Sequence, residues 1–198
     1  MLGSLPGRGS VAVNRQKLAE AVRIFLDGVG DAVRGEDLAR TPERVARAWA
    51  DELLSGYAID PRGIITWEPV EGEQGLVVVQ KIDFQSVCLH HLLPFTGKVS
   101  IAYLPAQRQT GLSKLVRLVD CLSRRLQIQE RLTSQILEII VETLEPRGAA
   151  CMLVARHECL SCRGVRRPAA RVVTLRTQGA CAEPPYRDET MRLLEAAG

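Results

Sequence analysis

The 198-residue sequence contains no apolar run long enough to cross a membrane. One of its longest apolar stretches, residues 149–155, falls far short of the roughly 20 residues that a membrane helix needs. The opening segment, MLGSLPGRGSVAVNRQ, also lacks an apolar core of signal-peptide length. Together these absences predict a cytoplasmic protein.

A strong excess of either charge is missing as well. The 26 basic and 23 acidic residues give a net charge of +3, which does not favour nucleic acid or an anionic membrane as a partner. Any anion site must therefore come from a local cluster of basic side chains. Without an export signal, the six cysteines are better explained as buried thiols, metal ligands or nucleophiles than as disulfides.

The hydrophobic pattern divides the chain into a tail, a helical part and a mixed domain. Residues 1–14 are rich in Gly, Ser and Pro, which is typical of a disordered tail. Apolar residues recur at helical spacing over 16–29, and Thr41-Pro42 suits the start of a second helix, with Thr41 as its N-cap. We therefore expect an N-terminal helical part over 15–70 and a second domain over 71–198.

Strands and helices are grouped in pairs in the second domain. Segments rich in β-branched residues predict strands over 76–84, 98–104, 149–158 and 171–177. Helical spacing predicts helices after Gly111, over 130–144 and from residue 188 onwards. Because two helices lie between two pairs of strands, without strand–helix–strand alternation, the order favours an α+β domain with an antiparallel sheet.

All three histidines lie in two short motifs, CLHH at 88–91 and HECLSC at 157–162. Cys88 and His91 are three residues apart just past a predicted strand, while His157 and Cys159 sit at i and i+2 and point the same way on a strand. Zinc accepts mixed Cys and His ligands, and a catalytic zinc keeps one position for water. The spacing fits an open site of Cys88, His91 and Cys159, and equally a closed structural site that adds Cys162.

A second group of candidates is basic. Gly111-Leu-Ser113-Lys114 places a glycine before a helix, with Ser113 as the expected N-cap, and a helix N-terminus suits phosphate. Each basic pair alone is typical of a solvated helix face, and only convergence would make a polyphosphate site. The candidate phosphate-binding residues are Ser113, Lys114, Arg117, Arg163, Arg44 and Arg47.

Gln129 and Glu130 stand where a further helix is expected to begin. A carboxylate there is favoured by the helix dipole whatever its function. Glu130 could instead accept hydrogen bonds from a base with adjacent N–H donors, such as guanine. Spacing alone leaves both interpretations open.

Four ordered segments resemble GTP cyclohydrolase I. They are TPERVARAWADELLSGY, DFQSVCLHHLLPFTGKVSIAYLP, GLSKLVRLVDCLSRRLQIQERLTSQI and ARHECLSCRGV, and they span about residues 40–166. The resemblance implies a tunnelling fold, with an antiparallel four-stranded sheet backed by two helices and an N-terminal helical part. It also implies a homodecamer of two stacked rings, with sites between subunits.

The resemblance implies a zinc enzyme that converts GTP and water to 7,8-dihydroneopterin triphosphate and formate, in folate or pterin synthesis. Its site residues carry over by position. The metal ligands would be Cys88, His91 and Cys159, and the acid/base pair His90 and His157. Guanine would meet Gln129 and Glu130. The triphosphate would meet Ser113, Lys114, Arg117 and Arg163, together with Arg44 and Arg47 of a neighbouring subunit.

Three positions depart from the family pattern. Leu89 replaces an acid, while Glu158 and Cys162 stand where apolar residues are common. We hypothesise that the carboxylate near the metal has moved from the first motif to the second. Two alternatives remain: a diverged paralogue acting on another guanine nucleotide, and a non-catalytic protein with a closed structural zinc site.

Overall fold

The computed structural model describes residues 12–30, 35 and 38–195, so most of the predicted tail over 1–14 lies outside the described residues. Its α-helices are α1 (Arg15–Val29), α2 (Thr41–Ala48), α3 (Leu112–Ser123), α4 (Gln129–Leu144), α5 (Glu158–Ser161) and α6 (Tyr186–Glu195). Its strands are β1 (Glu68–Pro69), β2 (Val77–Cys88), β3 (Pro94–Leu104), β4 (Arg108–Gln109), β5 (Leu126–Gln127), β6 (Gly148–His157) and β7 (Val172–Gly179). In this described part, no helix is both long enough and apolar enough to cross a membrane.

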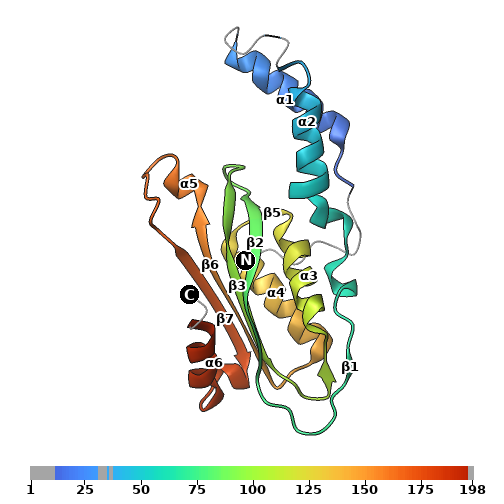
Figure 1. Cartoon of the computed structure of the whole chain (residues 1–198), viewed down its shortest axis with the longest axis vertical. Helices are drawn as coiled ribbons and strands as arrows, with labels where there is room; N and C mark the ends of the chain where they lie inside the picture. Colours follow the sequence, from blue (N-terminus) through green and yellow to red (C-terminus); the bar gives the residue numbers. More distant parts are fainter. Residues whose placement is uncertain (1–11, 31–34, 36–37, 196–198) are drawn as a thin grey trace.

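Four antiparallel strands in the order β2-β3-β6-β7 form the central sheet (Figure 1). Helices α3 and α4 back one face, where their leucines and isoleucines form one core with the inward side chains of β2, β3 and β6. A second cluster joins Ala102, Ala150 and Met152 of the sheet to Leu194 of α6. The predicted α+β class, with an antiparallel sheet backed by two helices, is confirmed, but the predicted count of four strands is one too few.

The sheet has a fifth strand that the sequence pattern does not predict. Strand β5 pairs in parallel with the end of β2, opposite Val87 and Cys88. It is two residues long and therefore too short to show a periodic pattern. This strand fixes the start of α4 beside the end of β2.

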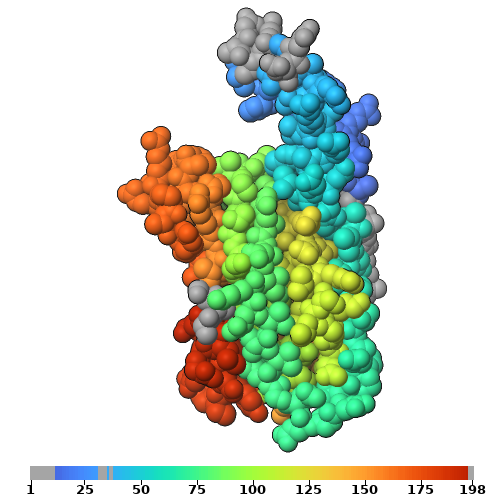
Figure 2. Space-filling view, in the orientation of Figure 1, coloured from blue at the N-terminus to red at the C-terminus, as the bar shows by residue number. Residues whose placement is uncertain are grey.

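Helices α1 and α2 pack against each other and stand away from the sheet at one end of the molecule (Figures 1 and 2). The predicted N-cap at Thr41 is wrong by one residue. Thr41 is already helical, and Arg40 is the N-cap, whose carbonyl accepts the first helical hydrogen bond from the amide of Arg44 at 3.1 Å. After Ala48 the chain continues through a π-helical turn (Trp49–Leu53) and short 3₁₀ turns (Ser55–Ala58, Pro61–Gly63).

Candidate metal and acid–base site

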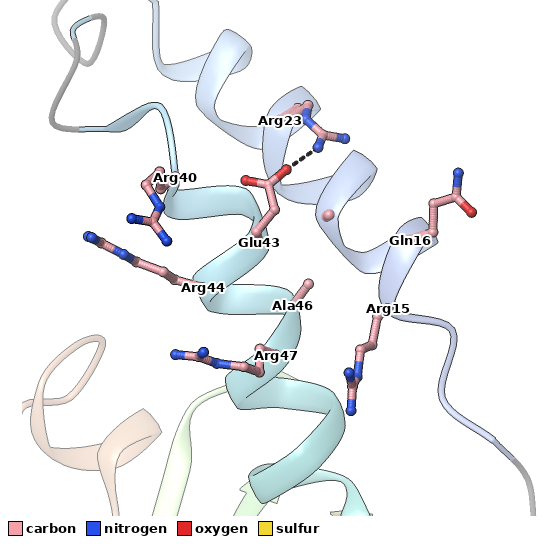
Figure 3. A pocket seen from close by; sticks show the side chains of 9 residues that line it. Arg15, Gln16, Arg23, Arg40, Glu43, Arg44, Ala46 and Arg47 are labelled. Atoms are coloured by element: carbon pink, nitrogen blue, oxygen red, sulfur yellow. Dashed lines mark hydrogen bonds and ion pairs between the residues drawn. The ribbon is translucent and has the colours of Figure 1, made fainter.

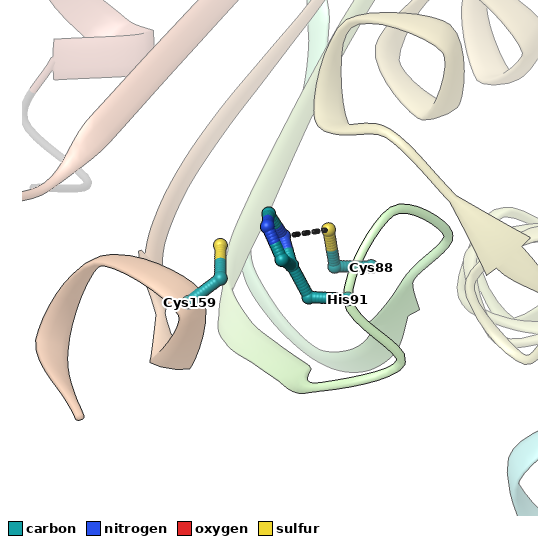
Figure 4. A group of neighbouring side chains, drawn as sticks. All are labelled: Cys88, His91 and Cys159. Atoms are coloured by element: carbon teal, nitrogen blue, oxygen red, sulfur yellow. Dashed lines mark hydrogen bonds between the residues drawn. The ribbon is translucent and has the colours of Figure 1, made fainter. Parts of the chain in front are cut away.

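Three side chains bring two sulfurs and an imidazole together at one end of the sheet (Figure 4). The ligand atoms of Cys88, His91 and Cys159 all lie within 4.8 Å of one another, and Cys88 Sγ is 3.9 Å from His91 Nδ1. Cys88 is buried, Cys159 is half-buried and His91 is exposed. The three predicted ligands therefore share one place in the folded chain.

Local hydrogen bonds fold the first motif back on itself. The amide of Leu92 donates to the carbonyl of Cys88, and the amide of Cys88 donates to the carbonyl of Leu93, both at 2.8 Å. Leu92 takes a left-handed backbone conformation, with φ of 54°, to complete the turn. The turn brings His91 back beside Cys88.

Strand pairing brings the second motif to the first. Strands β3 and β6 are antiparallel and in register, with Phe95 opposite His157. The start of β3 therefore lies beside the end of β6, and α5 follows immediately with Cys159 in its only turn. Residues about 70 positions apart in sequence meet because two long strands are paired along their whole length.

This donor set suits a metal ion. Two thiols and one imidazole match the ligands that zinc prefers, and three protein ligands are typical of a zinc that keeps one position open. Among the described residues the group has no fourth member, and Cys162 lies outside it, exposed just after α5. The closed Cys₃His alternative therefore does not match the geometry of this chain.

His157 is held rigidly beside the metal group. Its ring stacks on Phe95, with centroids 4.6 Å apart and planes inclined by 5°. Its Nε2 lies 2.8 Å from Gln129 Oε1. The buried Gln129 amide nitrogen donates to three acceptors, which are the carbonyls of Leu153 and Val172 and the hydroxyl of Thr174. Carbonyl oxygens only accept, so this contact set fixes the amide orientation, and Nε2 of His157 must carry the proton.

Burial lowers the pKa of His157, while the Glu130 carboxylate opposes that shift. Glu130 is exposed at the start of α4, next to Gln129, whose side chain contacts His157. The side-chain amide of Gln129 is already hydrogen-bonded within the protein. The Gln129 backbone and the Glu130 side chain are therefore the groups of this pair that can hydrogen-bond to a purine base. The other acid/base candidate, His90, is exposed, with its ring edge-on to His91 and centroids 6.4 Å apart.

Glu158 does not reach the metal ligands. Its Oε2 accepts a hydrogen bond from Ser161 Oγ at 2.7 Å, and its Oε1 pairs with Arg156 at 2.9 Å. Leu89, at the position of the missing acid, is 37% exposed. Within the described hydrogen bonds, Glu158 therefore stabilises α5 and contacts neither His91 nor His157, which does not support the hypothesis that its carboxylate replaces the missing acid.

The candidate phosphate residues are not gathered around the metal group. Ser113 and Lys114 lie in the first turn of α3 and Arg117 near its middle, while the opposite end of α3 leads to β5 beside Cys88 (Figure 1). A helix of 12 residues is about 18 Å long, so one chain keeps the two sets apart. Arg163 is different, because its positive charge acts on the Cys159 thiol, whose pKa burial and the neighbouring Cys88 raise.

The expected N-cap of α3 is also wrong. Gly111 is the N-cap, with an extended backbone, and its carbonyl accepts from the amide of Lys114 at 2.9 Å. Ser113 is therefore inside the first turn. Its hydroxyl is exposed and makes no capping hydrogen bond, so it remains available to a ligand.

Arg44 and Arg47 line a cavity of about 540 Å³ at α1 and α2 (Figure 3). Arg40 lines it too, and the three arginine side chains project from the same side of α2. The acid between them, Glu43, is paired with Arg23 of α1. Arg40 is not among the predicted phosphate-binding residues, although its i, i+4, i+7 spacing with Arg44 and Arg47 is the signal that indicates it.

The chain is similar to several known proteins. The family model described as GTP cyclohydrolase I matches residues 18–195. The GTP cyclohydrolase 1 of Streptomyces griseus is 42% identical over 196 residues, covering 98% of this chain and 97% of its own. The GTP cyclohydrolase 1 of Streptococcus pyogenes serotype M3 is 42% identical over 186 residues, covering 93% and 95%. A solved structure, the archaeosine synthase QueF-Like in the apo form, is 18% identical, with a TM-score of 0.46 over 55% of this chain and 97% of its own.

Proposed function

The chain belongs to the GTP cyclohydrolase I family, and we propose that it converts GTP and water to 7,8-dihydroneopterin triphosphate and formate. The observation that carries the proposal is the Cys88, His91 and Cys159 group beside an immobilised His157. Such a reaction feeds folate or pterin synthesis. The cytoplasm as its location remains a prediction from the sequence.

Cys88, His91 and Cys159 would hold a zinc ion, which makes bound water acidic enough to act as a nucleophile near neutral pH. His157 would move protons during ring opening. Its Nε2 proton is committed to Gln129, so Nδ1 is the atom that can accept a proton and pass it to a departing ring nitrogen. Stacking on Phe95 keeps the ring from rotating away. His90 is the second proton carrier of the proposal.

Glu130 would read guanine by accepting hydrogen bonds from its adjacent N–H donors, since it is an exposed carboxylate next to Gln129, whose side chain contacts His157. Arg163 would meet the phosphates from the same subunit. Ser113, Lys114 and Arg117 would come from one neighbouring subunit, because the length of α3 keeps them from this chain's own metal group. Arg44 and Arg47 would also come from a neighbour, and the assembly would be a decamer.

The direct test incubates the purified, zinc-loaded protein with GTP. Formate is measured, and neopterin fluorescence is read after oxidation and dephosphorylation. Both products in equal amounts are the expected result. Formate from another purine nucleotide but not from GTP would identify a paralogue with a different substrate, and no formate from any purine nucleotide would exclude the activity.

Replacing Cys162 by serine separates an open site from a closed one. We expect zinc content and turnover of GTP to stay within about twofold of the unchanged protein, because Cys162 lies outside the ligand group. Metal analysis by plasma emission and the formate assay check both. Loss of zinc together with activity would instead make Cys162 a ligand.

Mixing two variants, each defective in a different half of the site, tests whether sites are shared between subunits. Cys159→Ala removes the metal half and Lys114→Ala weakens the phosphate half. If the halves come from different subunits, randomly mixed oligomers regain up to about a quarter of full activity, since one site in four receives two intact halves. Each variant dissociated and reassembled alone is the control. Verified mixed oligomers with no gain would contradict a shared site.

Arg40→Gln tests the third arginine of α2. We expect the KM for GTP to rise about 3- to 10-fold with kcat little changed, because a cation that contacts phosphate in both ground and transition states changes uniform binding. Steady-state kinetics at two salt concentrations measure it. Arg187→Gln, on α6, also removes an exposed charge, one paired with Asp188, and is expected to leave KM unchanged. An unchanged KM in Arg40→Gln would remove Arg40 from the site.

A further inference from the structure

Cys162 follows the proposed zinc ligand Cys159 by three residues, in a turn between β6 and β7. The turn is helical: the amide of Cys162 donates to the carbonyl of Glu158 at 3.0 Å, and Cys162 itself has φ of −92° and ψ of −15°. Residues three apart on a helix are surface neighbours, with Cβ atoms about 5–6 Å apart. A disulfide needs a Cβ separation of about 3.5–4.5 Å, so a small adjustment of this turn brings the two cysteines within bonding range.

Cys162 is also the accessible thiol of this protein. The structure describes all six cysteines and pairs none of them, and Cys162 is the exposed one. Every residue over 162–171 is exposed, so this segment can adjust without disturbing the core (Figure 1). Cys121, Cys151 and Cys181 are buried elsewhere. A soluble oxidant therefore meets Cys162 first.

We propose that Cys159 and Cys162 form a redox-reactive dithiol that low-molecular-weight disulfides oxidise to an intramolecular bridge. The thiolate of Cys162 attacks one sulfur of the disulfide, whose S–S bond breaks and releases one thiolate. The Cys159 thiolate then attacks the Cys162 sulfur, the protein S–S bond forms, and the second small thiolate leaves. Two protein sulfurs are oxidised and one small disulfide is reduced to two thiolates, one of which takes the proton lost from Cys162 while the other takes a proton from water.

The bridge removes a ligand from the metal group. A disulfide sulfur is no longer the thiolate that zinc binds, so the site keeps only Cys88 and His91. Zinc is then released, and a thiol reductant restores the ligand. The release of zinc rests on the proposed metal site, whereas the bridge itself rests only on the geometry of the turn.

The test uses the zinc-loaded full chain and oxidised glutathione. Trypsin cuts after Arg156 and Arg163, so both cysteines fall on one peptide, HECLSCR, at residues 157–163. After oxidation and blocking of free thiols, we expect this peptide to lose two hydrogens and carry no blocking group. A chromogenic zinc chelator follows metal release in the same samples, and dithiothreitol is expected to reverse both changes.

Cys162→Ser is the matched variant, since it keeps the three ligands and changes one sulfur to oxygen. We expect its zinc release by oxidised glutathione to be on the order of tenfold slower. Equal release rates, a bridge joining Cys88 to Cys159, or a lasting glutathione adduct on Cys162 without a bridge would each overturn the proposal. Zinc content before oxidation is measured separately. A protein that binds no zinc but forms the bridge would disprove the metal site and leave the dithiol intact.

Discussion

Cys159→Ala is expected to abolish stable zinc binding and to lower formate production from GTP by at least about a thousandfold. Cys159 is one of three ligand atoms within 4.8 Å, and two ligands hold zinc poorly. The residue lies in the four-residue α5 and is only partly buried at the edge of the main core, so the fold is expected to survive. Metal analysis, the formate assay and circular dichroism on the same preparation check the three expectations.

Cys162→Ala is the control for this prediction. It removes a thiol from the same turn, three residues away, but from an exposed position outside the ligand group. Zinc and activity are expected to remain. If Cys159→Ala keeps a full equivalent of zinc, or if both variants lose it equally, the three-ligand site is wrong.

The grouping of Cys88, His91 and Cys159 could be predicted because their motifs are compact and chemically unusual. All three histidines lie in the two short motifs around Cys88 and Cys159, and strand pairing in register then brings those motifs together. The strands themselves followed from β-branched runs, although each extends beyond its predicted bounds at one or both ends. β2, for example, continues to Cys88 and carries the first ligand on the sheet itself.

The surroundings of the ligands depend on tertiary contacts that no local pattern contains. Gln129 is at a helix start in the sequence, where its side chain could serve a ligand as well as the protein. In the fold its amide nitrogen donates to backbone carbonyls of β6 and β7, and its amide oxygen accepts a hydrogen bond from His157. Its contact with His157 exists only because α4 packs against the sheet beside the end of β6.

The distance between the basic residues and the metal group is likewise a property of the whole chain. Lys114 and Arg117 have side chains suited to phosphate, but their positions in the sequence do not give their distance from a metal group. That distance depends on where the fold places α3. Helix α3 runs from β4 to β5. Its N-terminal end, which suits phosphate, therefore lies away from the metal group of the same chain. One chain therefore does not bring Lys114 to its own metal group, which supports the proposal of a site shared between subunits.

His157→Asn is expected to lower kcat by about 10²- to 10⁴-fold, with zinc content unchanged and the KM for GTP altered little. The imidazole is the proton carrier of the proposal, so its loss slows the chemical step. Its contacts are with Phe95 and Gln129, and it is not one of the three proposed metal ligands, so zinc binding is expected to remain. Gln129→Leu is expected to give a smaller loss, because the ring remains but its proton is no longer fixed on Nε2. Single-turnover kinetics with metal analysis measure both effects.

The double variant decides whether Gln129 acts through His157. If it does, the double variant has the same kcat as His157→Asn alone, so the two effects are not additive. Gln129→Leu also leaves the hydroxyl of Thr174 and two carbonyls without their donor, which is expected to lower the free energy of unfolding by about 1–3 kcal/mol. That structural cost persists in the double variant, whereas the kinetic cost does not. Additive losses in kcat would show that Gln129 serves the substrate directly and that the contact with His157 is incidental.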